Sequence, residues 1–343
     1  MKLIWLHSVR FYIKLGLFFY FKKIKVVNAK HIPNDKPVMF LSNHQNALLD
    51  ALLIATKCGC LSYFLTRASV FKNPLVSKLL NSLNMLPVYR IRDGWNTITN
   101  NNSIFDSCTV LLHQNESVVI FPEGSHNLNR TVRPLSKGFT RIVFDTLEKY
   151  PDTDLQLIPV GLNFSNAEMF ADSTSIYFGK PIAAKSFVSN NRNEDVRNLK
   201  KDIQSEISIL TTHIPTKDYE EILQKLKALN VDFLNPKAVN KCISNNFESC
   251  ERKPNSKINW LRVLLKRLLI LNVLPPYLIW KFIAQPKIKE QEFTSTFRFA
   301  ITITLVPIYL LFLVLFISVL FSLKIALFYV LSILLLSLIA VKL

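Results

Sequence analysis

The C-terminal segment, residues 299–343, constrains the fold more than any other part of the chain. Phe299 to Leu323 contains no charged residue, and after Lys324 the run from Ile325 to Val341 is again uncharged. As helices, the first run can cross a bilayer core of roughly 30 Å, and the second is near the lower length limit. The alternative is a buried helix pair in a soluble core, but such helices rarely stay apolar on every face over this length. We predict a transmembrane helical hairpin over residues 299–343, with Lys324 reaching out of the lipid at the turn.

The charge of the chain agrees with a membrane location. Lys and Arg number 42 against 24 Asp and Glu, so the formal net charge is +18, and half of the 343 residues are hydrophobic. This balance suits an anionic membrane surface or a nucleic acid. Motifs typical of nucleic-acid binding, such as a helix-turn-helix or a zinc finger, do not occur in the sequence. Basic residues flank the hairpin, so we predict an integral membrane protein with its main domain on the cytoplasmic face, bound to anionic lipid and to no nucleic acid.

Two further segments are predicted to lie on the membrane surface. Residues 1–30 carry basic and aromatic side chains and no acidic residue, and Arg10 and Lys14 interrupt the apolar stretch that a signal peptide would need. We predict a basic interfacial helix there, with an ordinary surface helix as the alternative. Residues 256–298 combine an apolar block, basic residues and a Pro275-Pro276 break. This composition is typical of a basic amphipathic segment on anionic headgroups.

Between these segments, short apolar runs alternate with helix-like stretches. We predict strands at 38–41, 62–65, 85–89, 118–121, 157–164 and 175–178, and helices at 47–57, 72–83, 96–114, 135–149 and 192–212. Strands separated by helices indicate an α/β fold with a central mixed sheet covered by helices. This domain is predicted to span residues 31–185, and residues 186–255 are expected to form a polar helical extension and linker.

Two motifs follow predicted strands, where the ligand sites of α/β sheets usually form. The first, Phe40-Leu41-Ser42-Asn43-His44-Gln45-Asn46-Ala47-Leu48-Leu49-Asp50, places an imidazole after a strand and a carboxylate near the start of a helix. A carboxylate partner can fix the tautomer of a histidine that acts as a general base. The alternative is a structural loop histidine followed by an unrelated helix-start Asp50.

The second motif is Val119-Ile120-Phe121-Pro122-Glu123-Gly124-Ser125-His126, followed by Arg130, Arg133 and Lys137. Pro122 restricts the backbone and Gly124 frees it, so the chain can turn sharply and present amide donors. The cations that follow suit a phosphate group. A tight turn with a solvated charged edge is the alternative.

In this order, the two motifs resemble those of the glycerolipid acyltransferase family, whose members carry an Asn-His…Asp block and a Phe-Pro-Glu-Gly block. Leu86-Pro87-Val88-Tyr89-Arg90 resembles the family block that ends in an acceptor-binding Arg, and Leu157-Ile158-Pro159-Val160-Gly161 resembles the late strand with its Pro. The resemblance covers roughly residues 30–185.

The resemblance implies acyl transfer from a thioester to a glycerol hydroxyl, with acyl-CoA or acyl-carrier protein as co-substrate and no cofactor. His44 would be the general base and Asp50 its orienting partner, and backbone amides near Gly124 would stabilise the oxyanion. Arg90, together with Arg130, Arg133 or Lys137, would hold the acceptor phosphate. The remaining predicted substrate-binding residues are Asn43, Pro122, Glu123, Gly124, Ser125 and His126.

The chain departs from the family pattern at two points. Five residues separate His44 from Asp50 where four are usual, so the loop or first helical turn must absorb one more. Ser125-His126 replaces the usual Thr-Arg after Phe-Pro-Glu-Gly, so another cation must take the place of that Arg. With these departures, the sequence resembles the subgroup related to fungal glycerol-3-phosphate acyltransferases more closely.

Several functions stay open at this point. The acceptor is expected to be 1-acylglycerol-3-phosphate, with glycerol-3-phosphate or another lysolipid as alternatives. A non-catalytic lipid-binding scaffold is an alternative of another class, and membrane-associated nucleic-acid binding ranks last. No metal site is predicted, because Cys58-Gly59-Cys60 has the wrong spacing for a zinc knuckle. Cys108, Cys242 and Cys250 are expected to be reduced thiols in a cytosolic setting.

Overall fold

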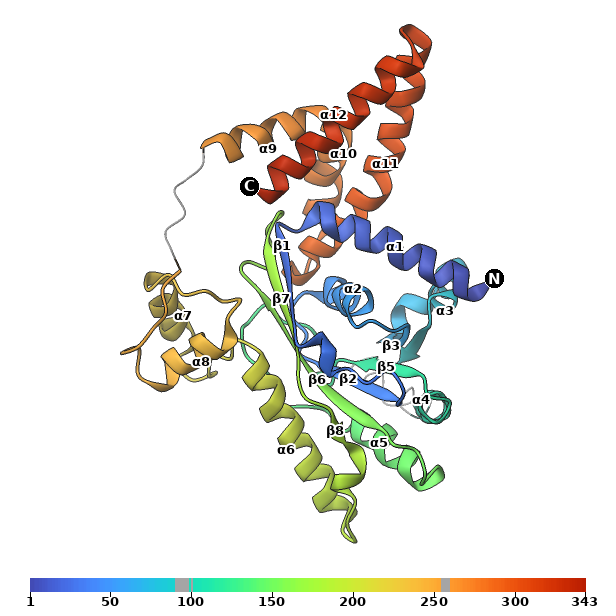
Figure 1. The fold of residues 1–343 in the computed structure, drawn as a ribbon, viewed down its shortest axis with the longest axis vertical. Coiled ribbons are helices and arrows are strands. Elements are labelled where there is room, and N and C mark those ends of the chain that lie inside the picture. Colours follow the sequence, from blue (N-terminus) through green and yellow to red (C-terminus); the bar gives the residue numbers. More distant parts are fainter. Residues whose placement is uncertain (90–98, 100, 254–259) are drawn as a thin grey trace.

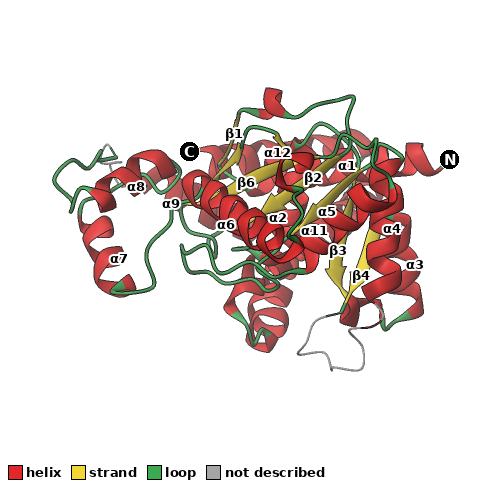
Figure 2. Cartoon of the chain, turned by 90° about the horizontal axis from the view of Figure 1, so that it is seen from below, coloured by secondary structure: helices red, strands yellow, loops and turns green. Residues whose placement is uncertain are grey.

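The computed structural model describes residues 1–89, 99, 101–253 and 260–343. A mixed sheet lies between helices, and a long helical hairpin projects from one end of the molecule (Figure 1). Helices flank both faces of the sheet, and two short helices form a lobe beside it (Figure 2). The predicted α/β architecture is therefore confirmed.

The central sheet has the strand order β1-β7-β6-β2-β5-β3-β4, with β8 paired to β6. β2, β5, β3 and β4 run parallel to one another and to β6, whereas β6 pairs antiparallel with β7 and β8. The sheet is thus mixed, as predicted, and the carboxyl ends of its central parallel strands share one edge. In chain order the strands are Lys23–Val27, Val38–Ser42, Ser62–Arg67, Met85–Val88, Ser117–Ile120, Gln156–Phe164, Ser173–Phe178 and Ile182–Ala183.

Two helical layers bury the faces of the sheet. On β2, Met39 and Leu41 join the core formed with α4 (Asn101–His113), α5 (Gly138–Lys149) and α6 (Arg192–Leu210). The alternate residue Phe40 faces the core formed with α1 (Lys2–Tyr20) and α2 (Ala47–Lys57). Successive side chains of a strand point to opposite faces, which is why a continuous apolar run serves both layers. A further helix, α3 (Pro74–Ser82), precedes β4.

The N-terminal prediction requires a correction. α1 ends at Tyr20, and Lys23–Val27 forms strand β1, so the helix expected over residues 1–30 is too long. β1 forms parallel backbone hydrogen bonds with β7. Its β-branched residues favour a strand, but the local sequence does not reveal the partner strand. α1 exposes large apolar side chains such as Ile4 and Phe11. Its place in a membrane interface stays a prediction.

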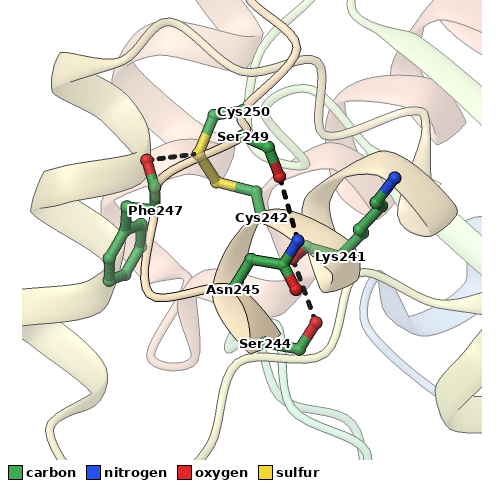
Figure 3. Close-up of a disulfide and its surroundings, with 7 residues drawn as sticks. All are labelled: Lys241, Cys242, Ser244, Asn245, Phe247, Ser249 and Cys250. Atoms are coloured by element: carbon green, nitrogen blue, oxygen red, sulfur yellow. Dashed lines mark hydrogen bonds between the residues drawn. A yellow bond between two sulfur atoms is a disulfide. The ribbon is translucent and has the colours of Figure 1, made fainter.

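Residues 192–244 form α6, α7 (Tyr219–Ala228) and α8 (Pro236–Ser244), and the last two enclose a small apolar cluster around Leu226 and Val239. Cys242 and Cys250 form a disulfide, so the expectation that both are reduced thiols is wrong (Figure 3). The chain after α8 turns back and brings the two Cα atoms within 4.7 Å. This turn is also held by a hydrogen bond from the Asn245 side-chain amide to the Ser249 hydroxyl, 3.0 Å long.

The C-terminal region contains the predicted hairpin. α11 (Thr294–Leu320) and α12 (Leu323–Lys342) belong to segments long and apolar enough to cross a membrane. The first helix begins at Thr294, five residues earlier than expected, and Phe293 is its N-cap. Before it, α9 (Trp260–Asn272) and the helical residues 274–287 meet at 99°, and this bent pair is long and apolar enough for a third span. The bend includes α10 (Leu274–Leu278) with its two prolines.

Gly161 of β6 offers a direct test of how tightly α6 packs on the sheet. A Cβ at this position would lie 2.1 Å from the carbonyl oxygen of Leu210, at the end of α6. We expect Gly161→Ala to lower the free energy of unfolding by about 3 kcal/mol, because backbone atoms cannot move aside as a flexible side chain can. Thermal unfolding of the detergent-solubilised protein measures the loss.

Gly138→Ala is the matched control. Its Cβ would meet Phe105 at 3.5 Å, an ordinary contact, so this variant should be neutral or slightly more stable. Equal unfolding temperatures for the two variants would show that α6 does not pack on β6 as described.

Candidate active site

The imidazole of His44 and the carboxylate of Asp50 form a hydrogen-bonded pair at the carboxyl end of β2. Nδ1 of His44 lies 2.8 Å from Oδ2 of Asp50. The Asp50 side chain is fully buried, whereas that of His44 is 16% exposed. A buried carboxylate therefore supports a histidine that solvent or a substrate can reach, and this is the arrangement that general-base chemistry requires.

The backbone between the two residues accommodates the additional residue of this chain. The Asn46 backbone N–H donates to Asp50 Oδ2 at 2.7 Å, and the Asn46 side-chain amide donates to the Ala167 carbonyl at 2.9 Å. Ala47 adopts a φ of +41°, which non-glycine residues rarely do. This local turn at the start of α2 brings the carboxylate back to the imidazole.

The second motif meets the first around the histidine ring. Phe121 stacks on His44 with ring centroids 4.1 Å apart, and His126 approaches the same ring edge-on at 5.6 Å. The Asn127 backbone N–H donates to the His44 carbonyl at 3.1 Å. The loop after β5 thus forms one wall of the site.

The Pro-Glu-Gly bend places an ion pair between a buried carboxylate and a partly exposed guanidinium beside this wall. Gly124 has a φ of +71°, and its N–H donates to the Phe121 carbonyl at 3.1 Å. Nε and Nη2 of Arg133 donate to Oε2 of Glu123 at 2.9 and 2.6 Å, and Nη1 donates to the Ser125 hydroxyl at 2.6 Å. Burial raises the pKa of Glu123, whereas the nearby Arg133 guanidinium opposes that rise. Glu123 therefore holds the cation that lies next to Ser125.

The other predicted substrate-binding residues have different environments. The Asn43 side chain exchanges two hydrogen bonds with the Leu162 backbone, of 3.0 and 2.8 Å, and so ties the β2 loop to β6. Arg130 donates to the Phe164 and Ser165 carbonyls at 2.7 and 2.8 Å and lies over the Phe233 ring. Desolvation lowers its pKa to about 10. Both residues connect elements of the fold, and Pro122 is buried beneath the bend.

Arg90 and Lys137 are the two remaining predicted cations. Arg90 falls outside the described residues. Lys137 is exposed at the start of α5, where an open groove of about 780 Å³ separates it from the outer face of α6. The polar residues that line this groove with Lys137 include Asn193, Arg197, Lys200, Lys201 and Gln204.

Sequence reasoning missed the residues that reach the site from the C-terminal region. Phe293, just before α11, lies edge-on to His126 with ring centroids 4.6 Å apart. Ser295, in the first turn of α11, donates to the Ala167 carbonyl at 2.6 Å, the same oxygen that Asn46 contacts. No local motif marks these residues, because only the folding of α11 against α2 brings them to the histidine.

Among the described residues, one group has side chains that could hold a metal ion. Ligand atoms of His126, Glu290 and Glu292 lie within 4.8 Å of one another. Nε2 of His126 is 3.9 Å from a carboxylate oxygen of Glu290, whose side chain is 57% exposed. An exposed carboxylate and a partly buried one beside a histidine also occur without a metal, so we assign the group no ligand.

One protein family and several known proteins are similar to this chain. Residues 23–163 match the family described as Acyltransferase. It is 26% identical over 133 residues to an uncharacterized acyltransferase of Schizosaccharomyces pombe, a match that covers 36% of this chain and 19% of that protein. It is 27% identical over 116 residues to glycerol-3-phosphate O-acyltransferase 1 of Saccharomyces cerevisiae, covering 33% of this chain and 15% of that protein.

A solved structure is also similar. The crystal structure of the 1-acyl-sn-glycerophosphate acyltransferase PlsC from Thermotoga maritima matches with a TM-score of 0.44 and 19% identity, over 59% of this chain and 78% of that one. The matched segments span less than a fifth of the two yeast proteins. The family predicted from the motifs is confirmed, and the predicted relation to fungal glycerol-3-phosphate acyltransferases holds as a distant similarity.

Asp172, at the end of the loop that carries Ala167, gives a test of the electrostatics around Arg130. Burial raises the pKa of Asp172 to about 7, although the Asn166 backbone N–H, 3.0 Å from Oδ1, opposes the rise. Because the folded-state pKa exceeds the ordinary value of 3.8, the stability from this group is complete below pH 3.8 and is lost as the pH rises through 7. We expect the free energy of unfolding of Asp172→Asn, relative to that of the native protein, to increase by about 2 kcal/mol as the pH rises from 5 to 8.

Thermal unfolding at a series of pH values measures this gain. Asp152→Asn, in an exposed turn, is the matched control and should follow the native protein at each pH. A constant difference between Asp172→Asn and the native protein would show that Asp172 does not titrate in this range.

Proposed function

We propose that the chain transfers a fatty acyl group from an acyl thioester to the free hydroxyl of 1-acylglycerol-3-phosphate, giving phosphatidic acid. The observation that carries the proposal is the hydrogen bond from the partly exposed His44 ring to the buried Asp50 carboxylate. The Glu123–Arg133 pair beside the same ring supplies a cation for an anionic headgroup.

The proposed reaction uses direct attack by the acceptor. With Asp50 on Nδ1, the neutral tautomer of His44 leaves Nε2 as the base. Nε2 takes the hydroxyl proton while the hydroxyl oxygen bonds to the thioester carbonyl carbon, and Asp50 stabilises the imidazolium. The tetrahedral intermediate then breaks its carbon–sulfur bond, and the proton on His44 passes to the departing thiolate. No acyl-enzyme is needed, because the acceptor itself is the nucleophile.

The backbone amide at Ser125 is a candidate donor to the oxyanion, because the amide of Gly124 already donates to Phe121. We propose that Arg133 takes the place of the Arg that usually follows the Phe-Pro-Glu-Gly block. Its guanidinium donates a hydrogen bond to the Ser125 hydroxyl, and the hydrogen bond to Glu123 fixes the orientation of the guanidinium. Arg90 remains a second proposed phosphate contact on sequence grounds.

Two other acceptors remain candidates within the same chemistry. The similarity to a yeast protein named glycerol-3-phosphate O-acyltransferase favours glycerol-3-phosphate as the second choice. Another lysolipid would use the same base with a different headgroup contact. We propose that α11 and α12 anchor the protein in a membrane with the catalytic domain on the cytoplasmic face, where basic surface segments meet anionic lipid.

The histidine pair provides the first functional test. His44→Ala and Asp50→Asn should each lower acyl transfer at least 100-fold, because they remove the base or its orienting charge. Membranes that contain the full-length protein are supplied with a labelled acyl thioester and with 1-acylglycerol-3-phosphate, glycerol-3-phosphate or another lysolipid. Product is quantified for each acceptor.

His113→Ala is the control, because His113 stacks on Tyr150 outside the site. It should retain native activity and membrane content. A lipid-binding scaffold predicts no transfer by the native protein on any acceptor, and turnover by His44→Ala at the native rate would exclude the proposed base.

We also propose that the groove between Lys137 and α6 binds the phosphates of coenzyme A. Its volume of about 780 Å³ is in the range of small-molecule sites, and Lys137, Lys200 and Lys201 give it positive charge. The groove begins beside the site, because the residue before Lys137 donates its backbone N–H to the Pro122 carbonyl at 2.7 Å. A pantetheine arm that extends from this groove would carry the thioester toward His44.

The double variant Lys200→Glu, Lys201→Glu tests this assignment. We expect KM for acyl-CoA to rise about 10-fold, because four units of charge change along the groove, while KM for an acyl-pantetheine that lacks the nucleotide stays unchanged. Lys225→Glu with Lys227→Glu on α7 makes the same charge change elsewhere on the surface. An equal rise in KM for both donors, or an unchanged KM for acyl-CoA, would contradict the assignment. A preference of the native protein for acyl-carrier protein over acyl-CoA would identify the other donor and also contradict it.

A further inference from the structure

The first turn of the membrane helix α11 is hydrogen-bonded to the same carbonyl as the catalytic loop. The Ala167 oxygen, in the loop between β6 and β7, accepts from the Asn46 side-chain amide at 2.9 Å and from the Ser295 hydroxyl at 2.6 Å. Asn46 and Ser295 are each 1% exposed. At such burial, water cannot easily replace a hydrogen-bond partner that is lost.

Other contacts hold this β6–β7 loop against the same helix. Nη1 of Arg298, one turn further along α11, donates to the Glu168 carbonyl at 2.8 Å. The Tyr20 hydroxyl donates to the Ser295 carbonyl at 3.3 Å, and the Ala171 N–H donates to the Tyr20 carbonyl at 3.2 Å. The loop is therefore clamped between the end of α1 and the start of α11.

Asn46 transmits the position of this loop to the candidate base. Its backbone N–H donates to Oδ2 of Asp50 at 2.7 Å, and the same oxygen lies 2.8 Å from the His44 ring. The side chain and backbone of one residue thus join Ala167 to the carboxylate. A shift of Asn46 must move the oxygen that orients His44.

The bond from Ser295 differs from those of two other hydroxyls in α11. Thr302 and Thr304 donate to carbonyls four residues earlier in their own helix, at 2.9 and 2.7 Å. Hydroxyls in helices commonly bond in this way. Ser295 instead reaches across the chain to residue 167. This choice of partner indicates a role outside helix formation.

We propose that Ser295, through the Ala167 carbonyl and Asn46, positions the His44–Asp50 pair, so that the base of the membrane hairpin is a working part of the active site. Ser295 and Asn46 are positioning residues for acyl transfer, and this inference rests on the proposed function. Loss of the Ser295 hydroxyl frees the β6–β7 loop to shift, and displacement of a catalytic group by about 1 Å can lower a rate 100-fold.

The test is a graded series at position 295 in the full-length protein in membranes. We expect Ser295→Ala to lower kcat about 10-fold with KM for both substrates within twofold. Ser295→Cys, which keeps the size but donates weakly, should lie between Ser295→Ala and the native protein. Thr304→Ala removes a hydroxyl from the same helix and should keep native kcat, because its bond is local.

A second measurement does not depend on turnover. Diethyl pyrocarbonate modifies accessible imidazole nitrogens, and mass spectrometry of the peptide that contains residue 44 gives the rate for His44. We expect this rate to change at least threefold in Ser295→Ala, because the ring loses its fixed orientation. The rate at His113 in the same molecules should stay unchanged.

The outcomes separate the two proposals. A changed His44 rate in a protein that transfers no acyl group supports the positioning role and refutes the proposed function. Activity that His44→Ala abolishes and Ser295→Ala leaves intact, with an unchanged His44 rate, overturns the positioning role alone. If Ser295→Ala fails to accumulate, Ser295→Cys decides, and native kcat with a native His44 rate in that variant overturns the inference.

Discussion

One carboxylate oxygen, Oδ2 of Asp50, organises the candidate site. It lies within hydrogen-bond distance of the His44 ring and the Asn46 backbone N–H, and its side chain has no exposure to solvent. An ionised carboxylate at such a depth is stable only when hydrogen bonds replace water. The positive φ of Ala47, the side-chain bond of Asn46 to the β6–β7 loop and the hold of α11 on that loop all serve this geometry.

Two helical layers lie on opposite faces of the sheet that carries His44. α1 and the base of α11 lie on the side of α2, whereas α5 and α6 cover the other face of the sheet. In Figure 1 the hairpin lies at the top, and α5 and α6 lie at the bottom. The groove proposed for coenzyme A and the base of α11 therefore lie on opposite faces of the sheet, so the two proposals are compatible in space.

Arg130 and Arg133 have different roles because they differ in burial. Arg133 is held by a carboxylate and stays partly exposed, so it can still meet an anion. Arg130 donates to two carbonyls at the end of β6, and desolvation lowers its pKa. A buried guanidinium must find acceptors for its donors, and Arg130 finds them in the fold. Their spacing in the chain gives no sign of this difference.

The sequence by itself determined the features that depend on local pattern. Apolar runs predicted the helix at Ala47–Lys57 and the hairpin, and the resemblance of two motifs to a known family singled out His44, Asp50 and the Pro-Glu-Gly bend. The Cys242–Cys250 disulfide and the Glu123–Arg133 pair join residues only 8 and 10 apart, but the turns that bring them together carry no periodic pattern. Strand β1 depends on long-range folding, because its partner β7 lies about 150 residues further along the chain. Ser295 is the clearest case: it lies 128 residues from Ala167, and no periodicity or motif encodes a single hydrogen bond across that distance.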